Sequence, residues 1–298
     1  MTDDSEGFTR RRDYPAAAAR PAPADPAATT SRAGRDLRAA IGVGVGLGAV
    51  VLATLLLSKP LFVAVTTVGI VLGVYELIQA LRAGRIEAPP VPTLAAAVTL
   101  MPLAYVGGTE ALAVGFACFC LAILVWRAAL GAERAVRDTA GGIFITAYVP
   151  LMSGLAALLV SEADGVARIV VFILVTICSD IGGYAVGVMF GRHPMAPSLS
   201  PKKSWEGFAG SVLSCVLAGV LSVVLLLDGA WWVGVLLGVA VACFATLGDL
   251  AESTLKRDLG IKDMGSTLPG HGGLMDRLDS LVMTLPVTFA ILTAFVPA

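Results

Sequence analysis

The stretch AWWVGVLLGVAVACFATLG, residues 230–248, carries no charged side chain and is followed at once by Asp249. A helix needs about 20 mostly apolar residues to cross the hydrocarbon core of a bilayer, so this stretch predicts a transmembrane helix. The rest of the chain is similar, because 57% of its 298 residues are hydrophobic and only 14% are charged. Soluble domains carry about a quarter charged residues. The composition therefore predicts an integral membrane protein.

Eight further apolar runs flank this stretch, and Pro60 separates the first two of them. The nine predicted spans are residues 39–57, 61–80, 91–107, 110–130, 139–160, 167–190, 208–227, 230–248 and 279–296. We expect an all-α polytopic membrane protein whose transmembrane catalytic domain covers residues 39–298. Residues 1–38 are rich in Ala, Pro, Asp and Arg, so they predict a disordered basic tail. The chain shows no recognisable signal peptide.

The placement of charge supports this topology. If the N-terminus is cytosolic and the nine spans alternate, 19 of the 21 Lys and Arg residues fall on the cytosolic side, and only Lys59 and Arg168 do not. This asymmetry follows the positive-inside rule. The 16 Arg against 5 Lys, with abundant Ala, are typical of a GC-rich bacterial genome, so we expect the inner membrane. The polar loops 191–207 and 256–280 then face the cytosol.

Acidic residues gather where the last two predicted spans meet the cytosol. Asp249 ends the eighth span, whereas Asp276 and Asp279 begin the ninth and share a helix face. Carboxylates repel one another at the membrane surface unless a cation lies among them, and Mg²⁺ prefers oxygen ligands. We predict that these three residues bind a metal. The alternative is a set of ordinary interfacial ion pairs with Lys256, Arg257 and Arg277.

Between these acids lies a glycine-rich turn, GSTLPGHGG, residues 265–273. Backbone N–H groups of such a turn before a helix attract anions. Gly270, Gly272 and Gly273 are therefore candidate phosphate-binding residues. His271 among them either donates to a phosphate or a leaving group or makes a structural hydrogen bond.

Two upstream segments also carry polar residues with alternative interpretations. Asp180 lies inside an apolar span, which indicates function by default, although it can instead pair with a basic residue of a neighbouring helix. Lys202, Lys203 and Ser204 in SPKKSWEG resemble a phosphate-binding group. The alternative for the lysines is a positive-inside anchor next to an interfacial tryptophan, Trp205.

The pattern SxxKRxxxxKDxGxxxPGHGGxxDRxDS, from Ser253 to Ser280, resembles the signature of the phosphatidate cytidylyltransferases, or CDP-diacylglycerol synthases. The segments SPKKSWEG and DIGGYAVGVMFG resemble other polar parts of the same family, so the likeness covers roughly the last 120 residues in detail. The basic tail is not part of the family pattern.

The resemblance implies transfer of CMP from CTP to phosphatidic acid, which yields CDP-diacylglycerol and pyrophosphate. It also implies a homodimer among membrane lipids, no nucleic-acid partner, and Mg²⁺, with a monovalent cation such as K⁺ beside it, on Asp249, Asp276 and Asp279. The expected catalytic residues are Lys256, Arg257, Lys262, Asp263, His271 and Arg277. The expected substrate contacts are Asp180, Lys202, Lys203, Ser204, Ser253, Gly270, Gly272 and Gly273.

Three other functions compete with this one. A CTP-dependent lipid kinase would transfer only the γ-phosphate. An ion-coupled transporter would place its acids near the bilayer midplane, commonly within inverted repeats; apart from Asp180, the acids here are expected at helix ends, and the chain shows no repeat. An alcohol phosphotransferase that consumes CDP-diacylglycerol would need a D-x-x-D-G-x-x-A-R pattern, which this sequence lacks.

Overall fold

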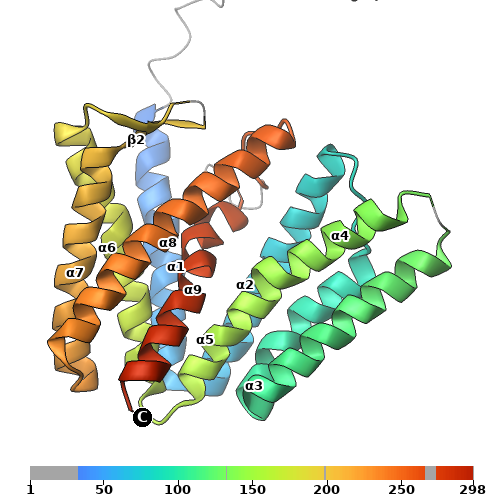
Figure 1. Ribbon diagram of the computed structural model, residues 1–298, viewed down its shortest axis with the longest axis horizontal. Coiled ribbons are helices and arrows are strands. Elements are labelled where there is room, and N and C mark those ends of the chain that lie inside the picture. The colour runs from blue at the N-terminus through green and yellow to red at the C-terminus, as the bar shows by residue number, and fades with distance from the viewer. Residues whose placement is uncertain (1–32, 132, 198, 266–272, 298) are drawn as a thin grey trace, which may run out of the picture.

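A computed structural model describes residues 33–297 apart from 132, 198 and 266–272, and this part of the chain is almost entirely helical (Figure 1). Its helices are α1 (Ala33–Leu57), α2 (Lys59–Ala83), α3 (Pro90–Ala129), α4 (Ala135–Thr146), α5 (Met152–Ser161), α6 (Gly165–Phe190), α7 (Trp205–Leu227), α8 (Trp231–Asp258) and α9 (Met275–Phe295). Most of the predicted tail lies outside the described residues, but residues 33–38 belong to α1.

Seven helical segments of the described chain are long and apolar enough to cross a membrane: α2, α3, the α4–α5 unit, α6, α7, α8 and α9. The apolar part of α1, Gly44–Leu57, is shorter. The all-α, multi-pass class is therefore confirmed, whereas the count of nine spans stays a prediction.

Helix α3 is in fact two antiparallel halves. Gly108 has φ 72° and ψ −164°, a left-handed conformation that glycine adopts at little cost, and the chain reverses there. Leu100 and Leu103 consequently pack against Gly115 on the returning half. The two halves correspond to the predicted spans 91–107 and 110–130.

Helices α4 and α5 are joined into one continuous helical segment by a π-helical turn, Ala147–Leu151. Pro150 lies in this turn, and because proline has no N–H the regular helical hydrogen-bond ladder is interrupted there. The predicted span 139–160 is thus one helical unit with a local widening.

The predicted loop 191–207 contains a short antiparallel hairpin of β1 (Pro194–Ala196) and β2 (Ser200–Ser204). Its end is fixed by Ser204, whose Oγ accepts a hydrogen bond from the Gly207 N–H at 3.1 Å and so caps α7. The hairpin therefore has a defined position over the end of the bundle.

Helix α8 continues past the predicted end at residue 248 to Asp258. Residues 249–258 contain neither glycine nor proline, and the helix ends where Gly260 adopts φ 69°. This extension projects Glu252 and Lys256 beyond the apolar segment.

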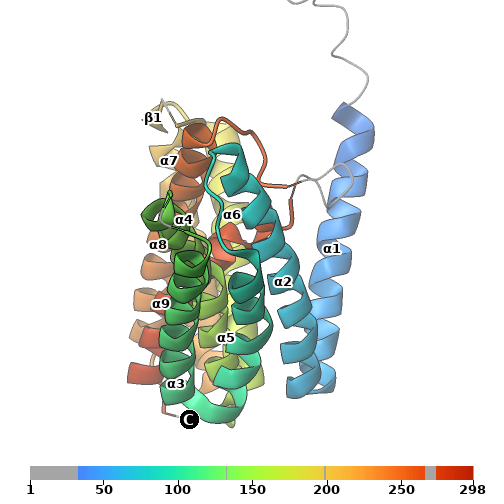
Figure 2. The same ribbon diagram turned by 90° about the vertical axis from the view of Figure 1, so that its right-hand side faces the viewer.

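Helices α6 to α9 pack together, α2 to α5 form the other part of the molecule, and α1 lies at one edge beside α2 (Figures 1 and 2). The hairpin, the α2–α3 and α3–α4 connections and the start of α9 lie at one end of the bundle (Figure 1). The α1–α2, α5–α6 and α7–α8 turns and the C-terminus lie at the other end.

The two basic residues that break the predicted charge asymmetry have structural roles at this second end. Arg168 is buried, pairs with Asp164 at 2.6 Å, and donates to the carbonyl oxygens of Leu292 and Val296 at 3.1 and 2.8 Å. It thereby satisfies carbonyls at the end of α9. Lys59 donates to the carbonyl oxygen of Glu162.

Candidate active site

A cavity of about 520 Å³ lies among α6, α7, α8, α9 and the hairpin. Predicted site residues from four separate elements line it: Asp180, Lys203, Ser204, Asp249, Asp276, Arg277 and Asp279. Hydroxyl groups that the sequence analysis did not single out add to the polar wall, from Ser179, Tyr184, Ser200, Ser211, Thr246 and Ser280. The three aspartates that the sequence suggested for a metal thus share one cavity with Lys203 and Ser204, two of the residues suggested for phosphate.

The carboxylates converge because α8 and α9 approach closely. A Cβ added to Gly248 would lie 2.9 Å from the Cβ of Met283, so glycine is needed at this crossing. The next residue, Asp249, forms an ion pair with Lys203 of β2. The hairpin therefore supplies a positive charge to the end of α8.

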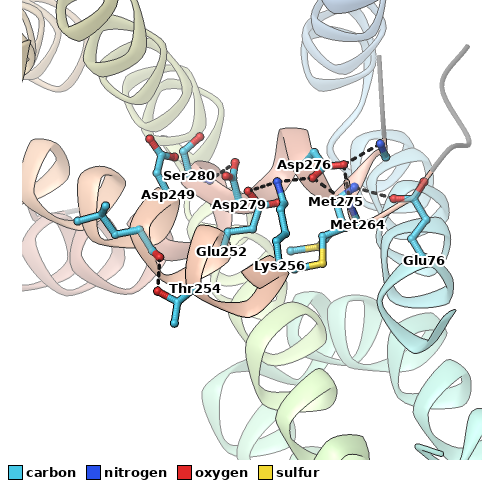
Figure 3. Close-up of polar contacts among 12 residues, drawn as sticks. Glu76, Asp249, Glu252, Thr254, Lys256, Met264, Met275, Asp276, Asp279 and Ser280 are labelled. Carbon is cyan, nitrogen blue, oxygen red and sulfur yellow. Dashed lines mark hydrogen bonds and ion pairs between the residues drawn. The ribbon is translucent and has the colours of Figure 1, made fainter. Parts of the chain in front are cut away.

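Another cationic side chain, Lys256 of α8, joins α8 to α9 (Figure 3). Lys256 Nζ lies 2.8 Å from Glu252 Oε2 and 2.6 Å from Asp276 Oδ1. Asp276 Oδ2 also accepts hydrogen bonds from the N–H groups of Met264 and Gly273, at 3.1 and 2.8 Å. The Asp276 carboxylate is therefore held by one ammonium group and two backbone donors.

Two further carboxyl groups are buried next to one another. Glu252 is 5% exposed and Asp279 is 8% exposed, and Figure 3 shows their side chains adjacent. None of the described residues donates a hydrogen bond to Glu252 Oε1, and the negative charges of Asp249 and Asp180 act on Asp279 as well. Carboxylates this close together and this little exposed to water are stable only when protons or bound cations offset their negative charge.

Within the part of the chain that the structure describes, no three Asp, Glu, His or Cys side chains form a group able to hold a metal ion. Asp249, Asp276 and Asp279 line one cavity without forming a closed set of ligands. Mg²⁺ in proteins usually takes one or two carboxylates and completes its coordination with water and substrate phosphate oxygens. The donor set fits that incomplete kind of site.

Several predicted residues lie away from the cavity or outside the described chain. Arg257, Lys262 and Asp263 are exposed, and the contacts described for them include no side-chain ion pair; Ser253 is half-buried. Lys256 contributes through Glu252 and Asp276 and does not line the cavity. The Lys202 side chain and the whole of Gly270, His271 and Gly272 fall outside the described residues.

The sequence analysis missed two acids. Glu252 lies three residues after Asp249 and four before Lys256, a spacing that places all three near one helix face. Glu76 lies inside α2, is 3% exposed, and accepts a hydrogen bond from the Met275 N–H at 2.9 Å. Glu76 could have been identified from the sequence, because an acidic residue inside an apolar span indicates a functional position. The expectation that Asp180 is the only such acid away from helix ends was wrong.

Fold and site together define a multi-pass helical membrane protein with a polar cavity of acids and bases at one end of its bundle. Residues 38–295 match the model of the cytidylyltransferase family, and the chain belongs to that family.

Similar proteins include a phosphatidate cytidylyltransferase of Mycobacterium bovis, 39% identical over 307 aligned residues that span 98% of this chain and 99% of the relative. One of Mycobacterium tuberculosis is 40% identical, spanning 98% of this chain and 92% of the relative. One of Staphylococcus aureus is 39% identical over 152 residues, or 50% of this chain and 57% of the relative. The family suggested by the signature is thus confirmed, and the similarity extends beyond the last 120 residues.

Proposed function

We propose that this chain is a phosphatidate cytidylyltransferase, which transfers CMP from CTP to phosphatidic acid and forms CDP-diacylglycerol and pyrophosphate. Its similarity to proteins of that name extends over nearly its whole length. The structural observation that supports the proposal is the shared cavity. Asp249 of α8 and Asp276 and Asp279 of α9 line it together with Lys203 and Arg277.

The reaction requires little covalent chemistry from the protein. A phosphate oxygen of phosphatidic acid is already anionic near neutral pH and forms the new bond to the α-phosphorus of CTP. The bond from that phosphorus to the oxygen bridging the β-phosphate breaks, and its electron pair leaves with pyrophosphate. Catalysis therefore depends on alignment of two anions and stabilisation of charge on the leaving group.

The cavity residues suit these tasks. Lys203 and Arg277 bring positive charge to the wall, where they attract the phosphates of either substrate. Ser204 both caps α7 and lines the cavity, so its position is fixed before substrate arrives. Lys203 pairs with Asp249 but lines the cavity, whereas Lys256 contacts Asp276 and Glu252 and does not line it, so we assign Lys256 to holding these two carboxylates.

We assign a magnesium ion to the acidic wall, where Asp249 and Asp279, with Asp276 beside them, would hold it together with phosphate oxygens of CTP. A monovalent cation such as K⁺ would bind in the same region. When bound, Mg²⁺ supplies positive charge that stabilises pyrophosphate as it leaves. The buried Glu252 oxygen, which accepts no hydrogen bond from the described residues, and the adjacent Asp279 support a cation in this region.

We place the cavity end of the bundle at the cytosolic face of the inner membrane. The support is the charge pattern, since the loops at this end contain most of the basic residues that the positive-inside rule assigns to the cytosol. In this orientation CTP reaches the cavity from the cytosol, whereas the acyl chains of phosphatidic acid stay in lipid. We further propose nine spans, with α1 and the two halves of α3 each crossing once, and a homodimer.

The test uses the purified full chain in detergent with phosphatidic acid, Mg²⁺ and either α-³²P or γ-³²P CTP. We expect label from α-³²P CTP in the lipid product, release of pyrophosphate, loss of activity with EDTA and recovery with added Mg²⁺. Lipid labelled only from γ-³²P CTP would identify a lipid kinase instead. Absence of labelled lipid with both nucleotides would contradict both functions.

A further inference from the structure

Helix α9, which carries two of the signature acids, begins without a capping side chain of its own. The residue before its first turn is Leu274, which makes no side-chain cap. The first N–H groups of a helix have no partner within the helix and need one elsewhere when they are buried. Met275, the first helical residue, is buried, so its N–H requires such a partner.

That partner comes from α2, 199 residues earlier in the chain. Glu76 Oε2 accepts the hydrogen bond of the Met275 N–H at 2.9 Å (Figure 3). A carboxylate at this position is also favoured by the helix dipole, whose positive end is at the N-terminus. Glu76 therefore caps α9 from another helix.

The packing around Glu76 restricts it to this position. Gly73, one turn earlier on α2, leaves room for the side chains of Met275 and Leu278 of α9. A Cβ added to Gly265 or to Gly273 would lie 2.5 or 2.6 Å from a carboxylate oxygen of Glu76. The backbone on both sides of the glycine-rich turn thus passes directly against this one carboxylate.

The same short region carries the site. Asp276 follows Met275 directly and accepts the N–H of Gly273, while Asp279 lies one turn further along α9. Both aspartates line the cavity, whereas Glu76 does not. A shift or fraying of the first turn of α9 would move both carboxylates.

We infer that Glu76 is a positioning residue for the transfer reaction: by capping α9 from α2, it fixes the first turn of α9 and so the carboxylates of Asp276 and Asp279. The inference rests on the proposed function for its activity readout. The second oxygen of Glu76, Oε1, is buried and has no hydrogen-bond partner among the described residues, so the position retains a carboxyl group at a desolvation cost that a purely apolar packing role would avoid.

The first test compares Glu76→Ala with Glu76→Gln. Glutamine keeps a carbonyl oxygen that can accept the Met275 N–H, whereas alanine removes the cap. We expect Glu76→Ala to lower kcat roughly 10- to 100-fold and to raise the Mg²⁺ concentration needed for half-maximal activity, with the KM for phosphatidic acid little changed. Glu76→Gln should stay within roughly threefold of the wild type. The matched control is Thr67→Ala. Thr67 is a buried polar residue of α2, and the hydrogen bond described for its hydroxyl goes to the Val63 carbonyl oxygen of the same helix.

A second readout is independent of turnover. Amide hydrogen exchange of residues 273–280, measured without nucleotide or metal, should become faster in Glu76→Ala and remain near wild type in Glu76→Gln and Thr67→Ala. Unchanged exchange and activity in Glu76→Ala would overturn the inference. The inference would also be overturned if Glu76→Gln folded but were as inactive as Glu76→Ala, or if Glu76→Ala lost its fold altogether. An inactive wild-type chain would instead contradict the proposed function, and the exchange experiment would still test the cap.

Discussion

Asp279 shows how a single residue in this protein combines burial with charge. Its side chain is 8% exposed, accepts the Ser280 N–H at 2.7 Å, and lies next to Glu252 while lining the cavity. A carboxylate in this position is costly unless it binds something positive. Its environment therefore favours a ligand role over a structural ion pair, for which the described contacts offer it no basic partner.

Replacement of Asp279 by asparagine tests this role with almost no change in volume. We expect Asp279→Asn to lower kcat by roughly 100-fold or more, because charge stabilisation at the leaving pyrophosphate is lost. Stability in detergent should not fall, since one buried charge is removed. The control is Asp228→Asn. Asp228 is exposed at the opposite end of the bundle and has φ 48°, a conformation that asparagine tolerates. Equal activity of Asp279→Asn and the wild type would remove Asp279 from the site.

At the scale of elements, the α6–α7 contact forms one wall of the cavity. Small residues let the two helices approach until side chains bond directly to backbone: Ser211 Oγ donates to the Ser179 carbonyl at 2.7 Å, and Ser214 Oγ to the Cys178 carbonyl at 2.8 Å. Such packing of small and hydroxyl residues is typical of membrane helices, where water does not drive association. The contact sets where α6 holds Asp180 relative to the cavity.

Gly210 is the position at which this contact is easiest to disturb. A Cβ there would lie 2.6 Å from Val186 Cβ and 2.7 Å from the Gly182 carbonyl oxygen, so Gly210→Ala forces the helices apart. We expect a stability loss of about 1–3 kcal/mol, seen as a lower Tm in detergent, together with reduced activity. Gly69→Ala on α2, where a Cβ meets nothing within 4 Å, should leave both unchanged. If the two variants behave alike, close α6–α7 packing is not what shapes the cavity.

At the scale of the whole molecule, charge is segregated between the two ends of the bundle. The cavity, the hairpin and the connections that hold most basic residues share one end, whereas the two exceptional basic residues, Lys59 and Arg168, cap backbone groups at the other. The positive-inside rule predicts the membrane orientation from this asymmetry, and the same basic residues surround the cavity with positive charge that attracts phosphates.

Cysteine labelling of cells tests this orientation. In a chain whose five native cysteines have been replaced, we expect a membrane-impermeant maleimide to label Glu162→Cys in intact cells and Arg192→Cys only after permeabilisation. Both positions are exposed in the fold, so accessibility depends on the side of the membrane alone. The reverse labelling pattern would place the cavity outside.

The sequence alone determined the class of fold, most helix boundaries, the family and the three aspartates that the structure brings into one cavity. These properties are local: apolar length decides whether a helix crosses the bilayer, and a fixed register of charged residues around glycines survives as a readable pattern. Asp249 was singled out because it ends an apolar span, and Asp276 and Asp279 because they begin the next one and lie within that pattern.

Only the tertiary structure decided which side chains meet. The pairing of Lys203 with Asp249 joins residues 46 positions apart, and the capping of α9 by Glu76 joins residues 199 positions apart. No periodicity along the chain records such contacts, because they arise from how the helices pack. Lys256 shows both sources of information: its pair with Glu252 follows from their spacing on α8, whereas the sequence left its pair with Asp276 open as an alternative that only helix packing decided.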